Sequence, residues 1–236
     1  MAEPERLAVV LHGSGSTAEF ALRALGPGLR ESGYAPVGLD LRTGDVAEVE
    51  SALDAVVDAS VRLIAGISLG AHAAVRWAAR GSPDLAAGRL DGLWLVLPAW
   101  TGVPGPVAAL SAAAAAEVAA EGLDAAVARV RPQGWVGAEL ALAWPAYGQA
   151  GLVAALRQTA GSPGPSRADL GSLRVPCAIV GRPDDPFHPL AVAEEWSRLI
   201  PRAALRRPLL HAPTADPANL GRAAFSAWRD AVSGPR

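Results

Sequence analysis

A serine between two glycines is the group in this sequence best suited to act as a nucleophile. Residues 66–70 read Gly-Ile-Ser-Leu-Gly and match the pattern G-x-S-x-G. A nucleophile on a sharp strand-to-helix turn has strained backbone angles, and flanking glycines lack the Cβ atoms that would clash there. The helix after such a turn directs its N-terminal N–H groups at the reaction site. We therefore expect Ser68 to be a nucleophile between a strand at 62–65 and a helix at 69–79.

A histidine-glycine turn supplies groups that could stabilise negative charge. The sequence His-Gly-Ser-Gly begins at His12, directly after an apolar run at 7–11 that is expected to be a buried strand. In acyl transfer, negative charge grows on the substrate oxygen, and fixed backbone N–H groups stabilise it. The donors here would be the N–H groups of Ser14 and Leu69, an oxyanion hole. His12 and Gly13 would border the pocket. The alternative is a simple glycine turn with a structural histidine.

An acid and a base could come from two later loops. Asp184 and Asp185 follow an apolar run at 175–180, and His211 follows a short strand expected at 203–207. An imidazole can accept the proton of a serine, and an aspartate can hold the correct imidazole tautomer and stabilise the imidazolium. We expect the serine, one of these aspartates and His211 to form a catalytic triad.

For two further histidines we favour a structural role over a catalytic one. His72 lies one helical turn after Ser68, on a rigid helix behind the turn, where we expect it to pack or bond under the sheet. His188 lies three residues after Asp185, and it either lines the mouth of the site or is an ordinary loop histidine; we favour the loop histidine. Histidine and carboxylate are also the ligand types of zinc, but their spacing here resembles no compact ligand set. We therefore expect no metal site.

Strands and helices alternate along most of the chain, which predicts an α/β fold with a mostly parallel central sheet and helices on both faces. The expected strands lie at 7–11, 34–39, 62–65, 92–97, 175–180 and 203–207, and the expected helices at 17–32, 45–59, 69–79, 190–200 and 219–232. Gly26-Pro27 interrupts the first of these helices. Residues 101–172 contain no good strand. Helices are expected there at 108–130, with a break at Gly122, and at 138–144 and 152–158, and a loop at 161–166. The chain thus reads as a single domain, 1–236, with a helical segment inserted at 101–172.

The composition excludes several other chemistries. All 21 basic residues are Arg, and the absence of Lys excludes Schiff-base, pyridoxal phosphate and P-loop lysine chemistry. The formal net charge of −2 and the scattered arginines offer no basic face for nucleic acid. Cys177 is the only cysteine, so an intrachain disulfide is impossible. We expect a small-molecule substrate, no cofactor and no membrane contact. The polar N-terminus resembles no signal peptide, which favours the cytoplasm, and the oligomeric state stays open.

These motifs and their order along the chain resemble the α/β-hydrolase superfamily, and the resemblance covers nearly the whole length. It implies that the turn at His12 is the oxyanion loop after the family's third strand, so the first two family strands are missing. It also implies that the segment at 101–172 is the family's variable helical cap. One departure is Leu210, which precedes His211 where many relatives carry glycine.

The acid loop of the family leaves a choice between two aspartates. The family pattern G-x-x-D-x-x-x-P selects Asp184 when counted from Gly181, and Asp185 when counted back from Pro189. We favour Asp185 as the triad acid, because the Asp-Pro-Phe-His-Pro run that starts there should fix the approach to the next helix. Asp184 is the alternative acid.

The resemblance implies a serine hydrolase that acts on an ester or thioester of a small or apolar acyl group through an acyl-enzyme. Trp100 follows the strand at 92–97, at the sheet edge where ligands bind, and we expect it to form a wall of the pocket. Trp135 and Trp144 are either further pocket walls or cap core, and we favour cap core. A catalytically inactive binding module, or an acyltransferase or lyase with the same triad, would present the same motifs.

Overall fold

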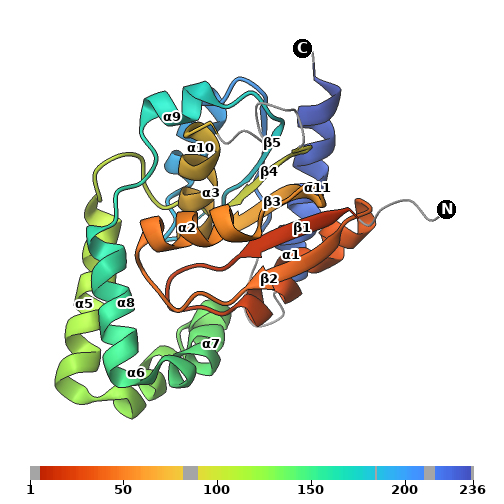
Figure 1. The fold of residues 1–236 in the computed structure, drawn as a ribbon. Helices are drawn as coiled ribbons and strands as arrows, with labels where there is room; N and C mark the ends of the chain where they lie inside the picture. Colours follow the sequence, from red (N-terminus) through yellow and green to blue (C-terminus); the bar gives the residue numbers. More distant parts are fainter. Residues whose placement is uncertain (1–5, 82–89, 184, 210–215, 235–236) are drawn as a thin grey trace.

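Within the described residues, six parallel strands form one sheet at the centre of the protein (Figure 1). The computed structural model describes residues 6–81, 90–183, 185–209 and 216–234. Across the sheet the strand order is β2-β1-β3-β4-β5-β6, and every neighbouring pair is parallel. The strands are β1 (Leu7–Leu11), β2 (Ala35–Leu39), β3 (Val61–Ile67), β4 (Gly92–Val96), β5 (Cys177–Val180) and β6 (Ala203–Arg206). The predicted α/β fold with a parallel sheet is therefore confirmed.

Helices cover both faces of the sheet, which explains why its central strands are apolar runs. Every residue of β4 and β5 is buried, whereas β2 and β6 at the two edges are largely half-buried. One face packs on α1 (Ala18–Glu31) and α11 (Ala218–Ser233). The other face packs on α2 (Val46–Val56), α3 (Leu69–Ala79), α9 (Arg167–Ser172) and α10 (Leu190–Leu199). No helix in the described ranges is both long and apolar enough to cross a membrane.

Helices α1 and α11 cross at very close range. A Cβ atom on Gly28 would lie 2.3 Å from the carbonyl oxygen of Gly221, and one on Gly221 would lie 2.6 Å from the carbonyl oxygen of Ala24. Only glycine permits this approach of the two backbones. Helix α1 continues through Pro27, where the sequence suggested an interruption. We infer that the packing of α1 on α11 offsets the hydrogen bond that proline cannot donate.

The inserted segment forms a helical layer beside the sheet (Figure 1). We call it the cap; it consists of α5 (Pro106–Glu121), α6 (Leu123–Val130), α7 (Gly134–Ala143), the 3-10 turn η1 (Trp144–Tyr147) and α8 (Gly148–Gly161). The predicted helix break falls at Gly122, whose φ is 89°. The cap has its own hydrophobic cluster, which includes Val118, Trp144 and Leu152. Helix α9, which the sequence did not predict, packs on the core instead, because Leu170 belongs to the core cluster.

Candidate active site

The turn that carries Ser68 is strained and sterically crowded. Ser68 joins β3 to α3 with φ 53° and ψ −113°, a conformation that residues with side chains rarely adopt. Its N–H donates to the carbonyl oxygen of Val96 at 2.9 Å, which ties the turn to β4. A Cβ atom on Gly66 would lie 2.3 Å from the Gly70 backbone, and one on Gly70 would lie 2.7 Å from Leu11. The strand-turn-helix context and the need for both glycines are confirmed.

The glycine loop after β1 lies directly against the serine. A Cβ atom on Gly13 would lie 3.2 Å from Ser68 Cβ and 3.9 Å from Ser68 Oγ. The Ser14 hydroxyl lies 2.5 Å from the hydroxyl of Thr159 in α8. No hydrogen bond of the described residues uses the N–H group of Ser14 or of Leu69. Two backbone donors beside the serine are therefore available to a ligand oxygen.

His12 supports this loop from behind. Its Nδ1 lies 2.8 Å from the carbonyl oxygen of Gly13, and its Nε2 accepts the N–H of Leu41 at 3.1 Å. These partners assign the proton of a neutral ring to Nδ1. Burial lowers the pKa of His12, although the Gly13 hydrogen bond and the Asp40 carboxylate act in the opposite direction. Gly13 lines the cavity at the serine, whereas His12 is not among the residues that line it. Both ring nitrogens instead contact backbone groups of the two loops.

A cavity of about 360 Å³ opens at Ser68 between the sheet and the cap. Trp100 lines it and is 7% exposed, and Gly13 lines it beside the serine. Trp135 and Trp144 line it too, although Trp144 also belongs to the cap cluster. The cap walls are mostly apolar: Val107, Leu110, Ala113, Ala114, Val118, Ala126, Val130, Val136 and Leu140. The cavity thus suits an apolar group near the serine.

His72 holds the turn that carries Trp100. The His72 side chain is fully buried, and its Nε2 accepts the N–H groups of Ala99 at 3.1 Å and Trp100 at 3.4 Å. Its ring meets the Trp100 ring edge-on, with centroids 4.8 Å apart. Burial foremost, and then the charges of His188 and Arg76, lower the pKa of His72 to about 3. The ring is therefore neutral and structural, which confirms the packing interpretation.

The buried neutral state of His72 predicts a pH-dependent stability. The unfolded chain binds a proton near pH 6.5, whereas the folded chain resists it until about pH 3, so stability is lost as the pH falls below 6.5. When the pH falls from 7.5 to 5.5, protonation of His72 in the unfolded chain should lower the free energy of unfolding by about 1.4 kcal/mol. Urea unfolding of wild type and His72→Gln at both pH values measures this, and the variant should lose about 1.4 kcal/mol less. Equal losses in both proteins would contradict the buried neutral ring.

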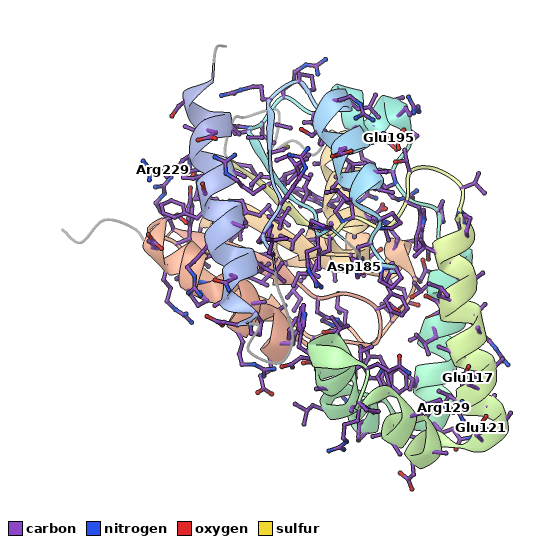
Figure 2. All side chains as sticks on the ribbon, turned by 180° about the vertical axis from the view of Figure 1, so that it is seen from behind. Glu117, Glu121, Arg129, Asp185, Glu195 and Arg229 are labelled. Atoms are coloured by element: carbon purple, nitrogen blue, oxygen red, sulfur yellow. The ribbon has the colours of Figure 1, made fainter. Side chains whose placement is uncertain are left out.

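Asp185 is a buried carboxylate whose two oxygens are both engaged. Its Oδ1 accepts the N–H groups of Phe187 at 3.0 Å and His188 at 3.1 Å. Its Oδ2 lies 3.2 Å from His188 Nδ1 and 3.4 Å from Arg182 Nη1. Burial alone would raise the pKa of Asp185, but the hydrogen bonds from His188 and Phe187 and the Arg182 charge outweigh it and lower the pKa. Figure 2 shows Asp185 near the middle of the molecule.

The structure describes only part of the predicted triad. Ser68 and Asp185 are described, whereas Asp184 and His211 lie outside the described residues. For His188 the sequence left two interpretations open, a place at the mouth of the site or an ordinary loop histidine, and favoured the second; in the structure it lines the same cavity as Ser68. The three-residue spacing between Asp185 and His188 was a signal that could have suggested this pairing. In the described part of the chain, no group of three or more His, Cys, Asp or Glu residues could hold a metal ion.

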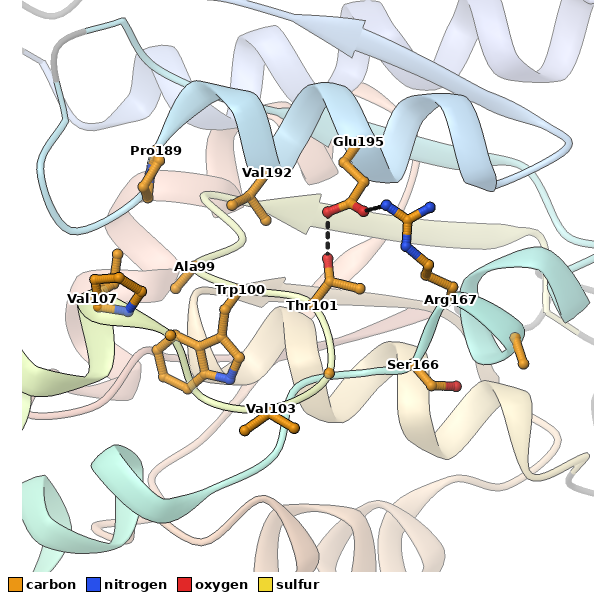
Figure 3. A pocket seen from close by; sticks show the side chains of 14 residues that line it. Ala99, Trp100, Thr101, Val103, Val107, Ser166, Arg167, Pro189, Val192 and Glu195 are labelled. Carbon is orange, nitrogen blue, oxygen red and sulfur yellow. Dashed lines mark hydrogen bonds and ion pairs between the residues drawn. The ribbon is translucent and has the colours of Figure 1, made fainter.

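A second cavity of about 690 Å³ shares Trp100 with the first as a lining residue (Figure 3). The Thr101 hydroxyl donates to Glu195 at 2.9 Å, and Arg167 forms an ion pair with the same carboxylate. The Glu195 carboxylate thus has a partner in each of these two residues. It is the larger of the two, but we place the active site at the smaller one because only that one contains Ser68.

Comparison with known proteins supports the fold. The chain superposes on the enol-lactonase from Burkholderia xenovorans LB400 with a TM-score of 0.70 and 16% identity, over 98% of this chain and 92% of that chain. A hydrolase from Pseudomonas aeruginosa PA01 gives a TM-score of 0.70 and 20% identity, over 99% and 92% of the two chains. MenH from S. aureus gives 0.65 and 16%, over 87% and 85%. No protein-family model and no curated protein sequence matches the chain. The chain has the α/β-hydrolase fold, as the sequence resemblance implied.

Proposed function

We propose that this protein is a serine hydrolase that cleaves an ester or thioester of an apolar acyl group. The observation that carries this proposal is the placement of Ser68 on a strained turn, within a cavity of mostly apolar walls. Backbone strain of this kind persists only where the surrounding structure enforces it, and it is concentrated at functional sites. The N–H groups of Ser14 and Leu69, which no hydrogen bond of the described residues uses, support the same proposal, because acyl transfer needs donors beside the nucleophile.

The proposed reaction proceeds through an acyl-enzyme. Ser68 Oγ attacks the substrate carbonyl carbon while its proton passes to the imidazole of His211, which Asp185 orients. The resulting oxyanion accepts hydrogen bonds from the N–H groups of Ser14 and Leu69. Collapse of the intermediate breaks the bond to the alcohol or thiol, which takes the proton from His211. Water then attacks the acyl-enzyme with the same proton transfers, and the acid product leaves. This chemistry requires no cofactor.

The compared structures support hydrolysis in general terms. One is called an enol-lactonase and another a hydrolase, and a lactone is a cyclic ester. A binding module that had lost its chemistry would have no need of a strained serine next to free backbone donors. The substrate itself is proposed from the cavity walls of this chain.

Covalent labelling tests the proposal directly. A fluorophosphonate reacts with an activated serine hydroxyl, so the folded protein should be labelled at Ser68 and nowhere else at comparable rate. Peptide mass spectrometry locates the label, and heat-denatured protein is the matched control. An unlabelled Ser68 in folded protein would reject the enzyme and favour a binding module.

The apolar walls predict a graded preference for the acyl chain. We expect Trp100→Ala to shift the preference toward longer and bulkier acyl groups, because the indole lines the cavity. One methylene in such a pocket is worth only about 1–3 kcal/mol, so the shift in kcat/KM should be gradual. The measurement is kcat/KM over a series of p-nitrophenyl esters of increasing length. Trp228→Ala removes the same ring from α11, outside the cavity lining, and should leave the profile unchanged. A preference of wild type for charged acyl groups would contradict the apolar pocket.

A further inference from the structure

His188 is a second imidazole in the cavity of Ser68. It belongs to the loop between β5 and α10, and its side chain is 16% exposed. It lines the cavity together with the serine and with Phe187. Whether this histidine donates a hydrogen bond to a ligand or accepts one depends on which ring nitrogen carries the proton.

The hydrogen bond between His188 Nδ1 and Asp185 fixes which ring nitrogen carries the proton. Asp185 is an ionised carboxylate and can only accept, so His188 Nδ1 must donate its proton across the 3.2 Å to Asp185 Oδ2. In the neutral ring, Nε2 is then an acceptor. No hydrogen bond of the described residues uses His188 Nε2, and Nε2 is not among their buried unpaired atoms. Because His188 lines the cavity, a ligand bound there can meet this acceptor.

The same ring is not bonded to the nucleophile. No hydrogen bond in the described part of the structure joins the His188 ring to the hydroxyl of Ser68, although both line one cavity. Because both side chains line this cavity, a substrate bound in it can contact both.

The position of His188 indicates which part of a substrate it meets. Its neighbour Phe187 is 42% exposed, whereas Trp100 and Trp144 in the walls are 7% and 5% exposed. Because His188 adjoins the exposed Phe187 and its own side chain is 16% exposed, we infer that it lies toward the mouth of the cavity. If the apolar acyl group occupies the interior, the alcohol part of the ester lies at the mouth.

We propose that His188 contacts the substrate and selects esters whose alcohol part carries a hydrogen-bond donor, such as a hydroxyl group. The proposal rests on the proposed hydrolase function. Asp185 orients the ring, and Nε2 accepts the hydrogen bond from the donor. An alcohol without a donor leaves Nε2 without this partner, so it should be a poorer substrate.

A pair of esters that differ by one hydroxyl tests this. Ethyl butyrate and 2-hydroxyethyl butyrate carry the same acyl group, and titration of the released acid gives kcat/KM for both. Wild type should prefer the hydroxyethyl ester by roughly two- to tenfold, the range expected of one neutral hydrogen bond. His188→Phe removes the acceptor and should abolish the preference. His188→Gln keeps an acceptor at the end of the side chain and should restore part of it.

The ratio between the two esters separates this role from a structural one. A variant that only disturbs Asp185 would slow both esters equally and keep the ratio. The proposal is overturned if the ratio is the same in wild type and His188→Phe. It is also overturned if His188→Phe lowers kcat at least a hundredfold on both esters, since that would make His188 the general base. Failure of the hydrolase function itself would look different, because wild type would then cleave neither ester and Ser68 would resist the fluorophosphonate.

Discussion

Ser68→Ala is expected to lower kcat/KM for ester hydrolysis by several orders of magnitude while the fold is retained. Removal of a triad nucleophile costs on the order of a millionfold in kcat, and the residual rate comes from the oxyanion donors and binding. The substitution removes only one oxygen atom. The sharp turn depends on Gly66 and Gly70, which leave room for the neighbouring atoms, and both glycines are unchanged in the variant. Steady-state kinetics on p-nitrophenyl butyrate, with equal unfolding curves for both proteins, measures the effect.

A second serine provides the matched control. Ser111 lines the same cavity from α5, so Ser111→Ala removes a hydroxyl from the same cavity without touching the turn. We expect this variant to lose less than tenfold in kcat/KM. If Ser68→Ala kept a tenth of the wild-type value, Ser68 would not be the nucleophile.

The sequence predicts those parts of the fold and site that depend on neighbouring residues. The helix expected at 69–79 is α3 to the residue, and the strand expected at 7–11 is β1, because buried strands and their glycine turns are local patterns. The strain at Ser68 was predictable for the same reason, since only the spacing of its glycines is needed to infer a sharp turn.

The sequence fails to predict features of the structure that depend on contacts between residues far apart in the chain. We infer that helix α1 tolerates Pro27 because α11 packs closely on it, and Gly221, which this contact requires beside Gly28, lies far away in the sequence. The orientation of His12 depends on Leu41 in the same way. Helix α9 is different, because its capping box of Ser166 and Asp169 is visible in the sequence. The adjacent residues 161–166, which read Gly-Ser-Pro-Gly-Pro-Ser, indicated a loop, and the capping box at their end was therefore not recognised.

The sequence alone also does not show whether the His188 side chain faces the cavity or the solvent. Its spacing from Asp185 is visible in the sequence, but a loop can present such a pair to solvent or to a cavity. The burial of the Asp185 carboxylate, which is 5% exposed, decides between these outcomes. That burial comes from the packing of the whole loop, which no local pattern encodes.

The acid of the triad is tested by two single substitutions. Asp185→Asn should lower kcat by about four orders of magnitude, because an amide cannot hold the imidazole in the required tautomer or stabilise the imidazolium. The asparagine oxygen can still accept the N–H groups of Phe187 and His188, so the loop should keep its shape. Asp184→Asn should lose less than tenfold, and it is the matched control because it removes the same charge one residue away. Kinetics of both variants on one ester, beside thermal unfolding, gives the comparison. The opposite ranking would assign the acid to Asp184 and leave Asp185 as the support of His188 alone.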